Sequence, residues 1–102
     1  MKITIKDSGL VSKPNDGKFN FNAWPSIINV RKGLMLAAWS GERNAHICPF
    51  GKVMVARSYD GGHSWEPPYT AMETPLDDRD AGLCAYKEKI YLTSFNNSRK
   101  TQ

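Results

Sequence analysis

The chain has 102 residues, of which 40% are hydrophobic, 24% charged and 11% aromatic, and its formal net charge is +4. This composition is typical of one small globular domain and argues against a disordered chain. The lysines and arginines are scattered rather than gathered into a stripe, so we expect no nucleic-acid binding, and a small anionic ligand fits the charge better. No stretch approaches the ~18 apolar residues of a membrane span, so we expect no membrane partner.

The N-terminal segment and the cysteines give two further expectations. Residues before Val11 alternate polar and apolar types and lack the apolar core of a signal peptide, so the sequence as written predicts a cytoplasmic protein. A secreted or periplasmic parent is the alternative. Cys48 and Cys84 lie in different segments without metal-ligand spacing, so neither a metal nor another cofactor is predicted.

Strand patterns follow one another along the chain, and helix signals are absent. Two apolar runs joined by Arg31-Lys32-Gly33 predict a hairpin, because the glycine can adopt positive φ. Pro67 and Pro68 place the following strand at a sheet edge, where fewer donors are needed. The predicted strands, in chain order, are residues 2–6, 26–30, 34–39, 52–57 and 68–72. The last four predict one four-stranded meander over about residues 22–73.

The hairpin pattern recurs after 56 positions. This shift lays Ile27 over Leu83, and it also superposes Leu36 on Leu92 and Trp39 on Phe95. A repeat of ~40 to 50 residues with four strands per unit is typical of a β-propeller. We therefore predict an all-β chain that holds about one and a half four-stranded blades, the second covering about residues 79–96.

One and a half blades leave two sheet faces and an edge strand bare, so the chain should not close into a ring alone. Two explanations stay open. The 102 residues are an N-terminal fragment whose remaining blades belong to a longer chain, or copies of the chain associate with one another. In a full ring, the strand predicted at residues 2–6 would complete the last blade.

Residues 58–65 read Ser-Tyr-Asp-Gly-Gly-His-Ser-Trp and fit the pattern Ser-x-Asp-x-Gly-x-Ser/Thr-Trp at every defined position. The spacing predicts a tight turn in which short polar side chains bond to backbone groups and glycines supply positive φ. We expect a structural rather than a catalytic role for the residues of this motif: Ser58, Asp60, Gly62, Ser64 and Trp65.

This motif resembles the Asp box of the sialidase (neuraminidase) superfamily, and the order of motifs over roughly residues 21–95 is similar to bacterial sialidase-like proteins. The resemblance implies a six-bladed β-propeller with the Asp box facing away from the substrate. Sialidases usually open with Phe/Tyr-Arg-Ile-Pro, whose arginine clamps the substrate carboxylate, whereas this chain has Asn22-Ala23-Trp24-Pro25. The resemblance therefore implies a sialidase-like exo-glycosidase of altered specificity. Sortilin-like receptors also contain Asp boxes, so a non-catalytic propeller that binds glycan or protein is the alternative.

The segment from Gly41 to Gly51 corresponds to the loop in which sialidases carry their acid/base aspartate, but it contains no aspartate. His46 and Glu42 are the candidates for that catalytic role, since histidine can exchange protons near neutral pH. The alternative for His46 is a structural hydrogen bond. Arg43 is a candidate for substrate binding.

The segment Asp77-Asp78-Arg79-Asp80 is the second candidate, because the 56-residue shift places Arg79 over Ala23. An arginine flanked by carboxylates could clamp the carboxylate of a uronic or sialic acid. The alternative is a solvated turn in which aspartates cap the backbone. The predicted substrate-binding residues are Trp24, Arg43, Asp78, Arg79 and Asp80. We expect a terminal, acidic sugar as substrate of the intact parent, and an inactive fragment, because the family's tyrosine nucleophile comes later in the sequence.

Overall fold

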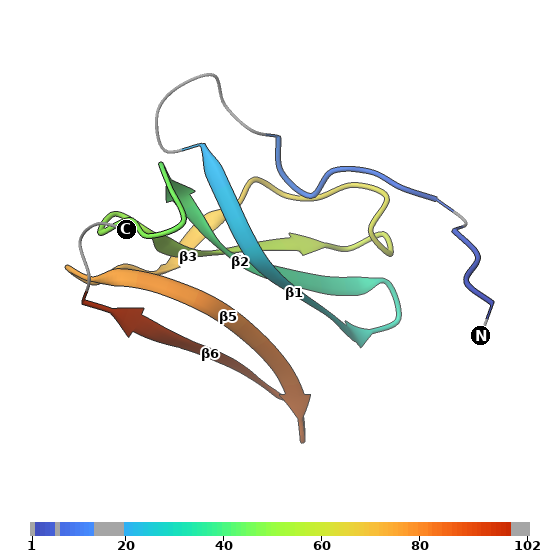
Figure 1. Ribbon diagram of the computed structural model, residues 1–102. Coiled ribbons are helices and arrows are strands. Elements are labelled where there is room, and N and C mark those ends of the chain that lie inside the picture. The colour runs from blue at the N-terminus through green and yellow to red at the C-terminus, as the bar shows by residue number, and fades with distance from the viewer. Residues whose placement is uncertain (1, 6, 14–19, 99–102) are drawn as a thin grey trace.

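The computed structural model describes residues 2–5, 7–13 and 20–98, and within them the protein is all-β, as predicted, with no helix. The strands are antiparallel and form two sheets, one of four strands in the order β1-β2-β3-β4 and one of two strands, β5 and β6 (Figure 1). Their bounds are β1 (Phe21–Arg31), β2 (Leu34–Arg43), β3 (Lys52–Ser58), β4 (Tyr69–Met72), β5 (Asp77–Tyr86) and β6 (Lys89–Asn97). The described residues contain no helix that could cross a membrane.

The four-stranded meander predicted from the apolar runs is confirmed. β2 and β3 are its central strands and are the most buried, which fits their uninterrupted apolar residues. β4 is short and lies at the edge, directly after Pro67 and Pro68, where a missing backbone donor costs least.

The N-terminal segment differs from its prediction. Residues 2–5 form no strand, and residue 6 lies outside the described residues. A strand needs a neighbouring edge for its hydrogen bonds, and the segment instead runs across the four-stranded sheet, where Val11 packs against a cluster that includes Trp39. Pairing of residues 2–6 with a blade outside this chain stays a prediction.

β1 and β5 repeat the same local irregularity, which supports the 56-residue shift for these two strands. A bulge separates Ala23 from Ser26 in β1, and a bulge separates Arg79 from Gly82 in β5. The residues inside the two bulges are Trp24, with φ of 53°, and Asp80, with φ of 55°. Such values are uncommon for residues other than glycine, so their recurrence marks one structural unit used twice.

The second strands of the two hairpins, β2 and β6, are related by a shift of 55 positions rather than 56. Ile28 pairs with Leu36, whereas its counterpart Cys84 pairs with Tyr91. The predicted superposition of Leu36 on Leu92 is therefore wrong by one position. The cause is a register shift just before the first turn, where β1 contains an extra residue. A difference of one residue moves a side chain to the other face of a sheet.

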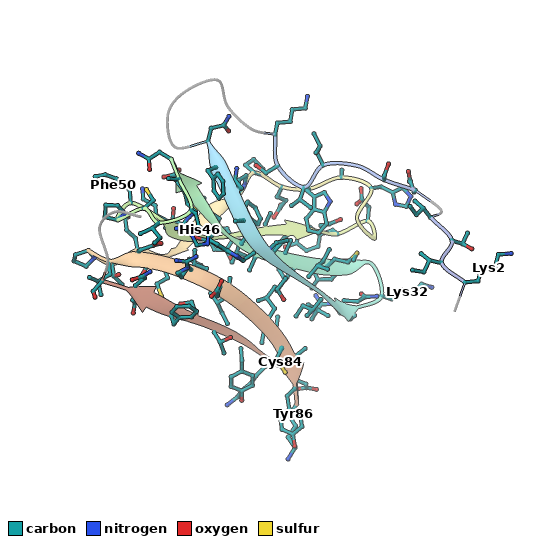
Figure 2. All side chains as sticks on the ribbon, in the orientation of Figure 1. Lys2, Lys32, His46, Phe50, Cys84 and Tyr86 are labelled. Carbon is teal, nitrogen blue, oxygen red and sulfur yellow. The ribbon has the colours of Figure 1, made fainter. Side chains whose placement is uncertain are left out.

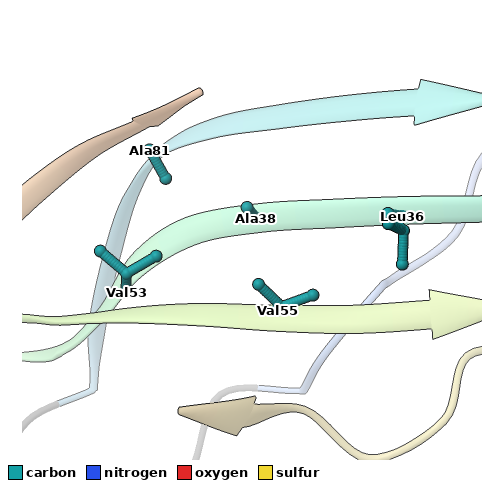
Figure 3. Close-up of a cluster of buried hydrophobic side chains, with 5 residues drawn as sticks. All are labelled: Leu36, Ala38, Val53, Val55 and Ala81. Atoms are coloured by element: carbon teal, nitrogen blue, oxygen red, sulfur yellow. The ribbon is translucent and has the colours of Figure 1, made fainter. Parts of the chain in front are cut away.

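The core lies between the two sheets. Leu36, Ala38, Val53 and Val55 of the four-stranded sheet face Ala81 of β5 (Figure 3). Partly buried side chains extend this contact along both sheets: Ile28, Val30, Met72, Leu83 and Leu92. The opposite face of the four-stranded sheet carries a second buried cluster, formed by Ala37, Trp39, Met54 and Ala56. The four-stranded sheet is thus apolar on both faces, and only one of them is covered by the other sheet.

Candidate functional site

The two ends of the four-stranded sheet carry different structures. At one end, the β1–β2 turn meets the β3–β4 loop, where the Gly61 N–H donates to the Gly33 carbonyl oxygen at 2.9 Å. At the other end, the β2–β3 loop meets the start of β5. Figure 2 shows Lys32 and His46, which mark these two ends. The Asp-box motif and the predicted site residues therefore lie at opposite ends of the strands.

The Asp-box turn is held by its own polar side chains. The Asp60 carboxylate accepts hydrogen bonds from the Ser64 N–H at 2.8 Å, from the Ser64 hydroxyl at 2.5 Å and from the Ser58 hydroxyl at 2.8 Å. Ser58 also accepts from the Gly62 N–H at 2.8 Å, and Gly62 has φ of 92°. Trp65 packs against the buried cluster of the sheet face that the N-terminal segment crosses. The geometry agrees with a structural role for this motif.

These hydrogen bonds make the stability of the turn depend on pH. Donation from Ser64 and then from Ser58 favours the ionised form and lowers the pKa of Asp60 well below its usual value. In the unfolded chain, an aspartate side chain has a pKa of about 3.9. The stabilisation is therefore complete above that pH and is lost as the pH falls through the folded pKa.

We accordingly expect Asp60→Asn to lower the urea midpoint at pH 7, and to lower it by less at pH 2.5, where the wild-type carboxylate has begun to lose its advantage. Urea unfolding at the two pH values measures the difference. Glu66→Gln, in the same loop, controls for the loss of one negative charge. An equal effect of Asp60→Asn at both pH values would contradict this explanation.

Five side chains meet at the other end of the strands, and we call them the strand-end cluster. Trp24 comes from the start of β1 and Arg43 from the end of β2, His46 lies in the β2–β3 loop, and Asp77 and Arg79 begin β5. The cluster thus joins the end of the four-stranded sheet to the second sheet.

A buried ion pair forms the base of the cluster. Arg43 donates through Nη1 to Asp77 Oδ1 at 2.6 Å and through Nη2 to Asp77 Oδ2 at 2.9 Å, and both side chains are 0% exposed. Arg43 also donates to Ser40 Oγ at 2.7 Å and to the His46 carbonyl oxygen at 2.6 Å. Asp77 accepts in addition from the Cys48 N–H at 3.2 Å. The pair therefore ties β2 and the following loop to β5.

Arg79 lies above this pair and stacks on an aromatic ring. Its Cζ atom is 4.2 Å from the centroid of the Trp24 ring, and the Arg43 Cζ is 4.9 Å from the same centroid. The His46 ring meets the Trp24 ring edge to face, with centroids 5.2 Å apart. Stacking fixes the plane of a guanidinium and leaves its N–H groups available for other partners.

Within the described residues, Arg79 has no carboxylate at hydrogen-bond distance. Its Nη1 is 3.7 Å from Asp77 Oδ2, and its buried Nε has no hydrogen-bond partner. Its Nη2 is 3.4 Å from His46 Nε2. A guanidinium can only donate, so a hydrogen bond at this contact requires an unprotonated Nε2 on His46.

The electrostatics of the cluster favour an anion. The single carboxylate, that of Asp77, is bonded to Arg43 and lies 3.7 Å from Arg79 Nη1, so two guanidinium groups share one negative charge. Arg79 is buried, with 7% of its surface exposed, whereas His46 beside it is exposed. A planar carboxylate matches a guanidinium fork through two parallel hydrogen bonds.

Two of the predicted substrate-binding residues, Arg43 and Asp78, are fully buried and bonded to neighbouring protein groups. Arg43 is fully buried by the contacts described above. Asp78 is also 0% exposed and accepts at 2.6 Å from both the N–H and the hydroxyl of Thr74, and it accepts from the Asn96 amide as well. We therefore correct the expected roles of Arg43 and Asp78 from ligand contact to support. For Asp78, the alternative of an aspartate that caps a turn applies.

Glu42 and Asp80 do not join the cluster. Glu42 is exposed and pairs with Lys52 at 2.8 Å, in a groove lined also by Phe50 and Glu73. Glu42 has φ of 55° and lies where the register of β1 and β2 shifts, and its catalytic role stays a prediction. Asp80 lies half-buried in the bulge of β5, one position beyond Arg79.

Asp77 is the residue of the cluster to which sequence reasoning gave no role. It stands in the candidate segment Asp77-Asp78-Arg79-Asp80, in which Asp78 and Asp80 flank Arg79 directly. Its partner lies 34 positions earlier in the chain. The spacing of residues gives no signal for a pair that forms only when two sheets pack together.

Comparisons of the chain with protein-family models, with curated proteins and with solved structures give no match.

Proposed function

We propose that this chain is one and a half blades of a sialidase-like β-propeller, and that its strand-end cluster binds the carboxylate of a terminal acidic sugar for exo-glycosidic cleavage in the intact ring. One observation carries this proposal. Arg79 is a nearly buried guanidinium that rests on Trp24 and has no carboxylate of its own within hydrogen-bond distance. Such an arrangement is suited to bidentate recognition of an anion.

The roles within the proposed site follow from the contacts. Arg79 binds the carboxylate, Trp24 holds the arginine in place and offers an edge to the sugar, and His46 stands beside the ligand as a general acid or base. The His46 ring is exposed, so it can exchange a proton with a leaving group or with water. A nucleophile would come from another blade.

The alternative function, binding of an acidic glycan without cleavage, is favoured by one feature of the cluster. Its single carboxylate, Asp77, is bonded to Arg43 and to the Cys48 N–H and is fully buried. The usual glycosidase mechanism needs two carboxyl groups that flank the scissile bond. This part of the chain therefore offers none, and catalysis would depend on His46 and on residues supplied by other blades.

The test is a comparison of two sugars that differ only in charge. Glucuronate, titrated into the chain and followed by the NMR signal of the Trp24 indole, is expected to bind weakly, and glucose is expected not to bind. Arg79→Ala should weaken glucuronate binding at least tenfold, since a charge-assisted hydrogen bond contributes about 1.5–3 kcal/mol. Arg79→Lys keeps the charge but loses the planar fork, so it should retain part of the affinity.

Arg57→Ala is the matched control, because Arg57 is a half-exposed arginine that pairs with Glu66 away from the cluster. It should leave glucuronate binding unchanged. Equal binding of glucose and glucuronate, or unchanged binding in both Arg79 variants, would refute the proposed site. Hydrolysis of an aryl glucuronide or aryl sialoside by the isolated chain, abolished in His46→Ala, would show that the residues of this chain are sufficient for catalysis.

A further inference from the structure

The two-stranded sheet of β5 and β6 has a bare apolar face. Leu83 and Leu92 point toward the core between the sheets, so their neighbours along each strand point away from it. Three aromatic side chains on that side are about half exposed: Tyr86 at 60%, Tyr91 at 49% and Phe95 at 52%. We call this side the outer face, and it carries Cys84, Tyr86, Tyr91, Thr93 and Phe95, with Lys89 opposite Tyr86 beside the turn.

The structural repeat shows what such a face does elsewhere in the same molecule. By the register of the two hairpins, Cys84 corresponds to Ile28, Tyr91 to Leu36 and Thr93 to Ala38. In the first hairpin, these positions pack against β5 and form the core between the sheets. The outer face therefore consists of the positions that, in the first hairpin, bind a second sheet.

The sheet that is bound in the observed contact presents Ala81, Leu83 and Leu92. Their counterparts in the first hairpin are Pro25, Ile27 and Ala37. These counterparts lie on the opposite face of the four-stranded sheet, next to the cluster of Trp39, Met54 and Ala56. We call this side the covered face, because the N-terminal segment crosses it; the sheet of β5 and β6 packs on the other face. One molecule therefore carries a second copy of each surface of the observed contact, the outer face and the covered face. These two surfaces lie on opposite sides of the molecule, and within the described residues neither packs against another sheet.

The covered face is only loosely protected. The N-terminal segment, residues 7–12, crosses it, and Figure 1 shows this segment on the side of the four-stranded sheet away from β5 and β6. One groove between the segment and the sheet is lined by Leu10, Ile27 and Trp65, and another by Val11 and Ala37. Ile27 is 54% exposed and Leu10 is 67% exposed despite their closeness. The segment forms no strand with the sheet, so it can be displaced without the loss of a strand ladder.

We propose that the outer face of one copy of this chain docks on the covered face of a second copy and displaces residues 7–12 there. The contact would repeat, between molecules, the packing that the two sheets already make within one molecule. It is a head-to-tail contact, so each added copy leaves one outer face and one covered face free, and closure gives a ring. This inference does not depend on the proposed sugar site.

The first experiment measures the mass of the chain by sedimentation velocity over a range of concentrations. We expect species larger than the monomer that grow with concentration. Tyr91→Asp places a charge in the centre of the outer face and should weaken association at least tenfold, as for a buried aromatic residue at an interface. Tyr59→Asp is the matched control, because Tyr59 is also about half exposed, at 59% against 49% for Tyr91, but lies at the Asp-box turn. A monomer at every concentration, or equal effects of the two variants, would overturn the proposal.

The second experiment tests the direction of the contact. Leu83 and Ile28 pack against the same buried cluster in the observed contact, and the Leu83 N–H donates to Ser26 Oγ at 3.2 Å. The repeat therefore brings Cys84 of one copy close to Ile27 of the next. Cys84 is exposed and Cys48 is buried, so Cys84 is the accessible native thiol.

Oxidation of Ile27→Cys with diamide should give a ladder of disulfide-linked dimers, trimers and larger species. The double variant Ile27→Cys with Cys84→Ser should give no ladder, and neither should the wild-type chain. A disulfide-linked dimer of the wild-type chain would mean that two outer faces meet each other, and this would overturn the head-to-tail contact. A monomeric Ile27→Cys chain after oxidation would do the same.

Discussion

Replacement of Asp77 by asparagine is expected to lower the free energy of unfolding by about 3–5 kcal/mol, because it leaves the Arg43 guanidinium buried without its counter-charge. Arg43 is 0% exposed and donates to both oxygens of Asp77, so an amide in that place meets two donors with only one oxygen. Native domains have only about 5–15 kcal/mol of stability in total. Urea unfolding, followed by tryptophan fluorescence, measures the loss, and circular dichroism shows whether any fold remains.

Two further variants separate the buried pair from charge in general. Glu73→Gln removes a carboxylate that pairs with Lys52 at 3.3 Å on the surface, and it should cost less than about 1 kcal/mol. Joint replacement of Arg43 by methionine and of Asp77 by leucine removes both charges, and it should recover most of the stability lost in Asp77→Asn. If the joint variant were as unstable as the single one, the pair would not be the source of the effect.

Substitution of Gly51 by alanine is expected to be destabilising by about 3 kcal/mol or more, since it forces the same ion pair apart. A Cβ atom at this position would lie 2.2 Å from Arg43 Nη1 and 2.8 Å from Asp77 Oδ1. Neither side chain can move aside, because both are fully buried and bonded on several sides. The urea midpoint of Gly51→Ala measures the effect.

Gly9→Ala is the control for this substitution, because a Cβ added at Gly9 meets no atom within 4 Å. It should leave the midpoint within error of the wild-type value. A double-mutant cycle gives the mechanism: in the background with methionine at 43 and leucine at 77, Gly51→Ala should cost less than in the wild type. Equal costs in the two backgrounds would show that Gly51 acts through the backbone instead.

The elements of the fold could be predicted because each strand has a local cause. The apolar runs of β2 and β3, the prolines before β4 and the recurrence of the first hairpin in β5 and β6 are visible in the sequence. The one-residue error in the second hairpin has a different origin. It depends on an extra residue in β1 near Val30, and a bulge of that kind leaves the alternation of the flanking residues unchanged.

The candidate site could be predicted in part. The segment Asn22-Ala23-Trp24-Pro25 and the shift of 56 drew attention to Trp24 and Arg79, and the structure places them in contact. The division of roles among Arg43, Asp77 and Asp78 could not be read from the sequence. All three are charged residues in polar segments, and their burial depends on contacts between residues far apart in the chain, such as those of Arg43 with Asp77 and of Asp78 with Asn96.

The recurring bulge at Trp24 and Asp80 separates the course of the backbone from the side chain that precedes it. In both strands, the backbone leaves the ladder at the same point, whereas the residue just before it is alanine in β1 and arginine in β5. The chemical identity of that position can therefore change without a change in the strand that presents it. A protein assembled from such units could acquire a different ligand through one substitution per unit, while the sheets that hold those units together stay as they are.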